Sequence, residues 1–231
     1  MTMQDSYLPL ECTQEIVGKP LLIFDFFAGT GSSTQAFEDA GHTVIKVELD
    51  EYFDAHERDI MELTAEYLVA KYGRPDFIWA SPPCTAFSIA AVGHHWNPDR
   101  TPKTEAASFN QLLVAKTLEL INELKPKAWL MENPRGMLRK LPVVQGLTRR
   151  TVTYCQYGDT RMKPTDLWGE IDWSPRAMCK NGDSCHEAAP RGSRTGTQGL
   201  KGAKDRSRVP YELSQEIATR LLTRTFTEML G

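Results

Sequence analysis

Short apolar segments alternate with helix-forming segments along most of this chain, and this alternation restricts the possible folds more than any other sequence feature. Buried strands are expected over residues 21–26, 42–50, 75–84, 125–134 and 149–158. Helices are expected over residues 32–40, within 53–73, over 106–124 and over 207–230. Because parallel strands need crossover connections, we predict a mostly parallel α/β sheet with helices on both faces.

The composition is that of an ordinary globular protein. Its 231 residues are 41% hydrophobic and 25% charged, with a formal net charge of -3, which suits one domain carrying a small insertion. No apolar run is long enough to cross a bilayer, and the start MTMQDSY lacks the regions of a signal peptide. The five cysteines are scattered and odd in number, which is typical of a reducing compartment. We therefore expect a cytoplasmic monomer without a membrane partner.

A glycine turn directly after the first expected strand is the first candidate binding element. The sequence FAGTG at residues 27–31 allows close approach of the main chain to a ligand, and the next helix offers unpaired N–H groups. Glu48 ends the second strand, where a carboxylate accepts the ribose hydroxyls of a nucleoside, and Asp59 lies where an adenine amino group is held. The turn alone is a weak signal, and solvated acids are the alternative for Glu48 and Asp59.

The sharpest motif is SPPC at residues 81–84, where an apolar strand runs into two prolines. The prolines fix the loop, so that Cys84 projects over the sheet edge as a thiolate nucleophile requires. Glu132, in MENP at the end of another apolar strand, supplies a carboxyl for proton transfer, and Asn133 helps to hold that loop. The alternatives are a structural loop cysteine and a solvated acid.

Cations follow the last expected strand. Arg161 and Lys163 in DTRMKPT stand where they can hold a carbonyl oxygen or a phosphate, or else they are surface charges. The cationic, glycine-containing stretch 191–208 predicts either a basic surface for phosphates or a solvated loop. Residues 94–96 (HHW) lie in a polar loop that either closes over the site or is a plain loop.

A cysteine–histidine group, CKNGDSCH, lies in the apolar-poor stretch before residue 208. Cys179, Cys185 and His186 are three soft ligands, and Cys155 or another residue can complete a tetrahedral zinc site. The spacing is not that of a standard zinc finger, so free loop cysteines are the alternative.

These motifs, in the order FAGTG, Glu48, RDI, SPPC, MENP and RMK, resemble the cytosine-5 DNA methyltransferase family, particularly its short phage-encoded members. The resemblance covers Leu21 to about Thr165 and resumes at 209–222 (VPYELSQEIATRLL), like the family's last motif. It implies a Rossmann-like fold that uses S-adenosylmethionine, and DNA as the substrate. The cofactor pocket is then assigned to Phe27, Ala28, Gly29, Gly31, Glu48, Asp59, Ile60, Ser81 and Pro83.

The same resemblance assigns the catalytic roles. Cys84 is the nucleophile that adds to cytosine carbon 6, which makes carbon 5 nucleophilic enough to accept a methyl group. Glu132 is the partner of ring nitrogen N3, and Arg161 contacts the target base with Lys163 beside it.

The chain also departs from the family pattern. It has ENP rather than ENV, Thr160, Arg161 and Lys163 instead of a glutamine-arginine-arginine pattern, and no asparagine before Val209. The large target-recognition domain is missing. We expect a catalytic domain formed by residues 1–169 and 206–231, with a small irregular insertion over 170–205, and hence short or relaxed sequence preference on double- or single-stranded DNA.

Two other functions stay open at this stage. An RNA or transfer-RNA cytosine-5 methyltransferase would share the pocket and differ in the surface that contacts the polymer. A non-catalytic DNA-binding relative would keep the fold, although the presence of Cys84 and Glu132 argues against it. A phage enzyme would act in the cytoplasm of its bacterial host, for example in restriction-modification.

Overall fold

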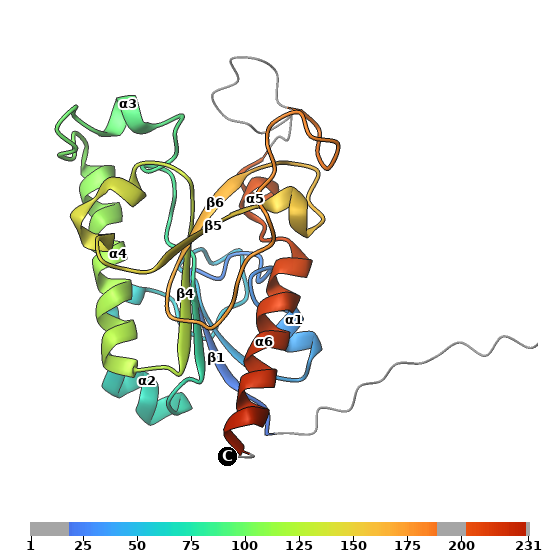
Figure 1. Cartoon of the computed structure of the whole chain (residues 1–231). Helices are drawn as coiled ribbons and strands as arrows, with labels where there is room; N and C mark the ends of the chain where they lie inside the picture. Colours follow the sequence, from blue (N-terminus) through green and yellow to red (C-terminus); the bar gives the residue numbers. More distant parts are fainter. Residues whose placement is uncertain (1–18, 189–201, 230–231) are drawn as a thin grey trace, which may run out of the picture.

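The computed structural model describes residues 19–188 and 202–229. Parts of the expected insertion and of the basic stretch therefore lie outside the described residues, as do residues 1–18. The strands are β1 (Leu22–Phe26), β2 (Thr43–Val47), β3 (Phe77–Ala80), β4 (Ala128–Pro134), β5 (Arg149–Thr153) and β6 (Pro164–Trp168). They form one sheet in the order β2-β1-β3-β4-β6-β5, and Figure 1 labels β1, β4, β5 and β6 of this sheet.

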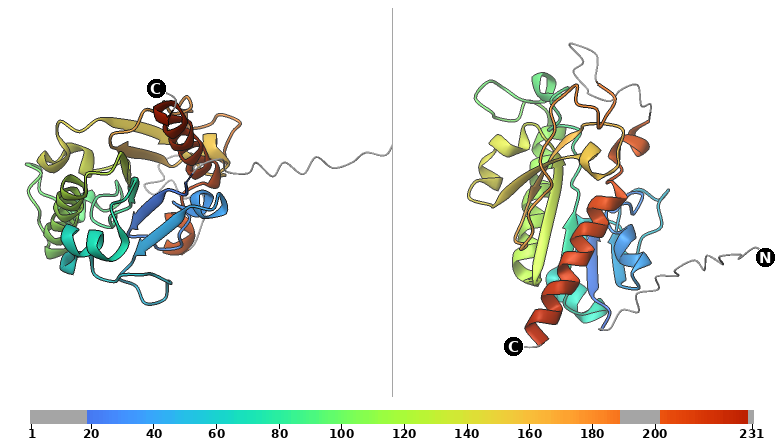
Figure 2. Two further views of the ribbon diagram at one scale, coloured as in Figure 1. Left: turned by 90° about the horizontal axis from the view of Figure 1, so that it is seen from below. Right: turned by 45° about the vertical axis from the view of Figure 1, so that its right-hand side comes forward.

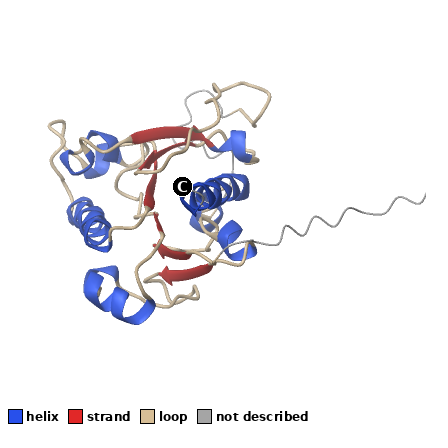
Figure 3. Cartoon of the chain, turned by 60° about the horizontal axis from the view of Figure 1, so that its bottom comes forward, coloured by secondary structure: helices blue, strands red, loops and turns tan. Residues whose placement is uncertain are grey.

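Helices cover both faces of this sheet (Figure 3), which confirms the predicted α/β architecture. One face carries α2 (Ala65–Tyr72) and α4 (Glu105–Leu124), and the other carries α1 (Gln35–Asp39) and α6 (Tyr211–Met229), which lie against each other in Figure 2. The short helices α3 (Val92–His95) and α5 (Ala203–Ser207) lie beyond the end of the sheet. The remaining turns are 3-10 helices: η1 (Ile60–Glu62), η2 (Leu138–Lys140), η3 (Pro142–Val144) and η4 (Tyr154–Tyr157).

The core is divided by the sheet into two apolar clusters. On one side, Phe24 and Ile78 of the sheet belong to a cluster with side chains of α2 and α4 such as Leu120. On the other side, the cluster contains Phe37 of α1 and Leu213 of α6. Burial on both sides explains why the strands are continuous apolar runs rather than alternating ones. Among the described helices, none combines the length and the apolar character that a membrane span needs.

The strand order determines where a ligand can bind. Strands β1, β2, β3 and β4 pair in parallel. The chain passes from β1 to β2 on one side and then to β3 on the other, so the connections diverge between β1 and β3. In open α/β sheets the crevice at such a point, outside the carboxyl ends of the strands, is the usual ligand site. The glycine turn and the Cys84 loop both start there.

One strand, β6, was not expected from the sequence. It runs antiparallel to both of its neighbours, β4 and β5. Its sequence PTDLW begins with proline and carries a buried aspartate, which are poor strand signals. Asp166 is tolerated there because Arg139 forms an ion pair with it and the Thr151 hydroxyl donates to it at 2.8 Å. These partners are distant in sequence, so the strand depends on tertiary contacts.

Some expected elements are present but are shorter than predicted. The helix expected over 32–40 is reduced to α1, which ends before Gly41, at φ +78°. The loop after Cys84 contains α3, and Trp96 is a buried residue that stacks on Phe87 with ring centroids 5.9 Å apart. Trp96 therefore packs in the core rather than closing over the site.

A buried carboxyl links β1 to the helix that follows. Asp25 is fully buried and accepts hydrogen bonds from Ser33 Oγ at 2.8 Å and Thr34 Oγ1 at 2.6 Å. Its second oxygen has no hydrogen-bond partner among the described residues. Burial raises the pKa of Asp25 from 3.8 to about 6, although the two hydroxyls oppose this shift. The glycine turn between Asp25 and Ser33 is thus fastened at both ends.

We predict that Asp25 makes folding stability depend on pH. Its pKa is raised in the folded state, so the stabilisation is complete below about pH 4 and is lost as the pH rises through about 6, a difference of about 3 kcal/mol. Urea denaturation of Asp25→Asn should therefore vary less with pH across this window than that of the wild type. The exposed Asp54→Asn is the control. Parallel curves for wild type and Asp25→Asn would contradict the assignment.

Candidate active site at the carboxyl edge of the sheet

The glycine turn is held close to the end of β2. The main-chain N–H groups of Phe27 and Ala28 both donate to the Val47 carbonyl, at 2.9 and 3.1 Å. Phe27 has φ +63°, in the left-handed region, where a side chain other than glycine costs about 1–2 kcal/mol. Gly29 and Gly31 share this region, at φ +51° and +72°. The turn is therefore strained at Phe27 and depends on glycine at the next two such positions.

Two acids are predicted to bind the cofactor. Glu48 lies beside this turn, and Asp59 lies at the start of η1, in the segment after β2. The Glu48 carboxylate accepts from the Gly29 amide at 2.8 Å and from the Asp50 amide at 2.9 Å. Asp59 caps η1 by accepting from the Met61 amide at 2.9 Å. Ile60 is buried in the core. Glu48 is thus physically joined to the glycine turn, whereas Asp59 shapes the segment after β2.

The start of α6 docks onto the residues that follow the glycine turn. The Val209 amide donates to Ser32 Oγ at 3.0 Å, and Ser214 Oγ donates to the Ser33 carbonyl at 2.8 Å. Val209 and Ser214 are buried. The carboxyl-terminal motif VPYELS, distant in sequence, therefore lies directly against the turn, as the family resemblance implies.

The Cys84 loop is held by two buried asparagine side chains. Asn133 Nδ2, predicted to hold the loop of Glu132, donates to the Pro82 carbonyl of the Cys84 loop at 2.8 Å. Asn110 Nδ2, from α4, donates to the Pro83 carbonyl and to Thr85 Oγ1, both at 3.2 Å. The sequence does not identify Asn110, because a single polar residue in a helix gives no signal of what it contacts.

The remaining loop contacts fix both sides of Cys84. The Cys84 carbonyl accepts from the amides of Phe87 and Ser88, both at 3.0 Å. Ser81 receives the indole N–H of Trp79 at 3.1 Å, and its amide donates to the Phe26 carbonyl at 2.9 Å. Ser81 therefore joins the Cys84 loop to the end of β1, and its neighbour Pro83 is half-buried in the same loop.

Glu132 is buried beside the Cys84 loop. Residues Ala80 and Met131 are paired across β3 and β4, so Ser81, which follows the end of β3, lies level with Glu132 in β4. Tyr154 donates its hydroxyl to Glu132 Oε1 at 2.9 Å. Burial raises the pKa of Glu132, while the Lys163 ammonium and the Tyr154 hydrogen bond oppose this shift. Glu132 is therefore disposed to carry a proton, which a surface carboxyl would not.

The charge of Glu132 also acts on the Cys84 thiol. Burial raises the pKa of the Cys84 thiol, and the charge of Glu132 raises it further, while Lys163 and Arg206 lower it. Burial lowers the pKa of Lys163, and its Nζ lies 4.5 Å from the centre of the Tyr154 ring. Tyr154 was not singled out from the sequence, because its buried position between Glu132 and Lys163 follows from tertiary packing.

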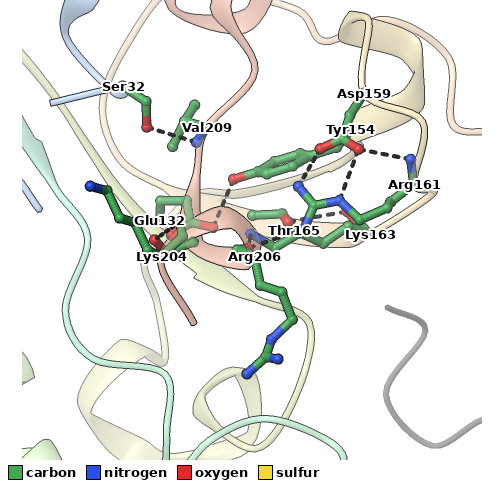
Figure 4. A network of polar contacts seen from close by, with 11 residues as sticks. Ser32, Glu132, Tyr154, Asp159, Arg161, Lys163, Thr165, Lys204, Arg206 and Val209 are labelled. Carbon is green, nitrogen blue, oxygen red and sulfur yellow. Dashed lines mark hydrogen bonds and ion pairs between the residues drawn. The ribbon is translucent and has the colours of Figure 1, made fainter. Parts of the chain in front are cut away.

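Arg161 and Lys163 are joined to a distant segment. Arg161 forms an ion pair with Asp159 and donates to the Arg206 carbonyl at 3.3 Å. Lys163 donates to the same carbonyl at 3.0 Å. Figure 4 shows both side chains directed at the main chain of Arg206, close to Tyr154 and Glu132. The predicted cations are thus in the site, and in this structure they hold the chain rather than extend to solvent.

We call residues 202–208 the strap, because two of its residues make contacts that tie it across the site. Arg161 and Lys163 hold the Arg206 carbonyl. Lys204 Nζ lies 3.3 Å from the Tyr52 hydroxyl and 4.6 Å from the centre of its ring. The strap therefore connects the loop after β2 with the turn before β6, on the side of the sheet where Cys84 and Glu132 lie.

The fold and the site together define a methyltransferase of the Rossmann-like class. A C-5 cytosine-specific DNA methylase family model matches residues 21–143, which contain the glycine turn, Cys84 and Glu132. The match covers more than half of the chain, and this protein belongs to the C-5 cytosine-specific DNA methylase family.

The chain is also similar to individual proteins. A probable DNA (cytosine-5)-methyltransferase of Frog virus 3 (isolate Goorha) is 28% identical over 218 residues, covering 87% of this chain and 98% of the viral protein. A methyltransferase of Entamoeba histolytica with a solved structure shares 13% identity at a TM-score of 0.49, over 66% of this chain. The chain matches about half of that solved protein, 53%.

We predict that Asn110 positions the Cys84 loop. Asn110→Ala leaves the Pro83 carbonyl without its donor, which should lower the free energy of unfolding by about 1–2 kcal/mol and slow methyl transfer about tenfold. The control is Asn122→Ala, an exposed asparagine on the same helix. Equal kcat/KM values for the two variants would show that Asn110 does not position the loop.

Proposed function

We propose that this chain methylates carbon 5 of cytosine in DNA, with S-adenosylmethionine as the methyl donor. One observation carries the proposal: a half-buried cysteine in the loop after β3 and a buried carboxyl of raised pKa on the neighbouring parallel strand β4 lie at the same edge of the sheet, where the charge of Glu132 acts on the thiol. A thiol nucleophile and a carboxylic acid on one edge are the two groups that an addition to cytosine needs.

The reaction then proceeds through a bond between Cys84 and the base. The Cys84 thiol gives its proton to solvent and its sulfur adds to carbon 6, while Glu132 gives its proton to ring nitrogen N3, so that electrons reach carbon 5. Carbon 5 would then take the methyl group of the sulfonium donor, and the bond from that methyl carbon to the donor sulfur would break to leave a neutral thioether. Loss of the carbon-5 proton to solvent, return of the N3 proton and release of the thiolate regenerate the enzyme. Lys163 offsets the charge of the thiolate.

The pocket for the donor is assigned to the edge between β1 and β3. A Cβ at Gly29 would lie 4.0 Å from Glu48 Oε2, so glycine keeps the main chain of the turn bare beside this carboxylate, which allows close approach of a ligand. The turn residues Phe27 to Gly31 hold the methionine part and Glu48 the ribose. Asp59 and Ile60 border the adenine, and Ser81 and Pro83 close the pocket from the β3 side.

DNA is assigned to the face covered by the strap. Lys204, Arg206 and Arg208 are exposed there and can contact phosphates. Within the expected insertion 170–205, Ile171 and Trp173 are buried in the core, which leaves a small surface for reading bases. We therefore infer short or relaxed sequence preference, and a duplex substrate must still release the target base from its stack.

The decisive test is trapping of the covalent bond. DNA containing 5-fluorocytosine should form an adduct that survives denaturing electrophoresis, because fluorine at carbon 5 blocks the final elimination, and Cys84→Ser should form none. Sequencing of methylated DNA would give the base context. Stronger trapping by fluorinated RNA would favour an RNA methyltransferase instead, and methyl transfer that persists in Cys84→Ser would refute the role of Cys84.

We predict opposite effects of Glu132→Gln on two reactions at Cys84. Methyl transfer should slow by about a hundredfold or more, because the amide cannot protonate N3. Alkylation of Cys84 by iodoacetamide above neutral pH should be faster, because the carboxylate that raises the pKa of the thiol is gone. Glu170→Gln, on the surface, should change neither rate. Slower alkylation together with slower methyl transfer would indicate a disturbed loop instead.

A further inference from the structure

A second cluster of reactive side chains lies apart from Cys84 and Glu132. Cys155, Cys179, Cys185 and His186 place their ligand atoms within 4.8 Å of one another. Cys155 comes from η4, directly after β5, whereas the other three come from the stretch after Trp173. The cluster gathers three of the five cysteines of the chain, and none of its members takes part in the reaction proposed above.

From this geometry we propose a structural zinc site with Cys155, Cys179, Cys185 and His186 as its ligands. Tetrahedral zinc, with bonds of about 2.3 Å to sulfur and 2.0 Å to nitrogen, separates sulfurs by about 3.7 Å and sulfur from nitrogen by about 3.5 Å. The Cys155–Cys185 sulfurs are 3.6 Å apart, and His186 Nδ1 lies 3.7 Å from Cys179 Sγ and 3.4 Å from Cys185 Sγ. The Cys155–Cys179 separation of 3.0 Å widens when zinc enters.

The surroundings of the cluster suit a closed site. Gln156 Nε2 donates to Cys185 Sγ at 3.2 Å, a contact that stabilises a ligating thiolate and orients it. His186 directs Nδ1 at the sulfurs, and its Nε2 lies 3.3 Å from the Gly182 amide. Binding of zinc at Nδ1 leaves the ring proton on Nε2, so the Gly182 contact is lost on loading. Three thiolates and one imidazole complete the coordination, which identifies a structural role rather than a catalytic one.

The segment that carries three of the four ligands has no hydrophobic core of its own to hold it in place. Residues 174–188 form neither helix nor strand and bury almost no apolar side chain. Main-chain hydrogen bonds attach them at three points, to the Tyr157 hydroxyl, Thr153 Oγ1 and the Thr160 carbonyl. A segment without a core of its own is commonly stabilised by a metal. Because Thr160 precedes Arg161, the zinc fixes the side of the site that holds the strap.

The first experiment measures zinc in the purified full-length protein, produced with zinc in the medium and kept reduced. Mass spectrometry of the metal should find about one zinc per chain. Cys179→Ser, Cys185→Ser and His186→Ala should lose it, while Cys84→Ser and Cys12→Ser should keep it. Absence of zinc from the wild type, or a disulfide between Cys155 and Cys179 in the unreduced protein, would overturn the proposal.

The second experiment uses the wild type alone, so that it does not depend on how the variants fold. Cobalt added to metal-stripped protein should give the absorption of a tetrahedral site with thiolate charge-transfer bands. Trypsin should cut after the exposed Lys180, between two of the ligands, only after zinc is chelated. An octahedral cobalt spectrum, or equal cleavage with and without zinc, would refute the site. Neither measurement uses methyl transfer, so its result is independent of the proposed function.

Discussion

Parallel pairing of β1, β3 and β4 brings the ends of these strands to one edge of the sheet, and the candidate active site depends on this constraint. The glycine turn and the Cys84 loop begin where β1 and β3 end, and Glu132 lies in the last residues of β4, although the three are far apart in sequence. The Ser81 amide then joins the Cys84 loop to β1, and Asn133 joins it to β4. A loop fixed from both sides can present a thiol in one position, which is a requirement for addition to a bound base.

Burial controls the chemistry of that edge. Glu132 is covered because antiparallel β6 pairs with β4 opposite it, at Leu167, and because Tyr154 closes the other side. Burial disfavours the charged forms of both the Glu132 carboxyl and the Cys84 thiol, the charge of Glu132 raises the pKa of the thiol further, and Lys163 is the compensating cation. A change at Glu132 therefore alters the titration of Cys84.

Residues 174–188 and the strap are held by polar contacts more than by apolar packing. Arg176 forms ion pairs with Glu212 and Glu216 of α6, and Arg161 and Lys163 hold the strap through a single carbonyl. Residues in this region bury too little apolar surface to offset the conformational entropy that is lost when they become ordered. The cysteine–histidine cluster is joined to the residue before Arg161, because the Glu187 amide donates to the Thr160 carbonyl. Arg161 in turn holds the strap, so the proposed metal site is connected with the segment that covers the active site.

The sequence by itself determined the α/β class, the strands β1 to β5, and the residues most suited to the chemistry, because apolar periodicity and motifs such as FAGTG and SPPC are local signals. Three members of the cysteine–histidine cluster were also visible as neighbours in sequence, with Cys155 as one of the options for the fourth. Only the tertiary structure decided four other features. Strand β6 forms because Arg139 compensates its buried Asp166. The other three are the contact of Asn110 with Pro83, the contact of Tyr154 with Glu132, and the hydrogen bonds of Arg161 and Lys163 to Arg206. Each of these depends on partners many residues away, and no local pattern encodes which distant group will satisfy a buried polar atom.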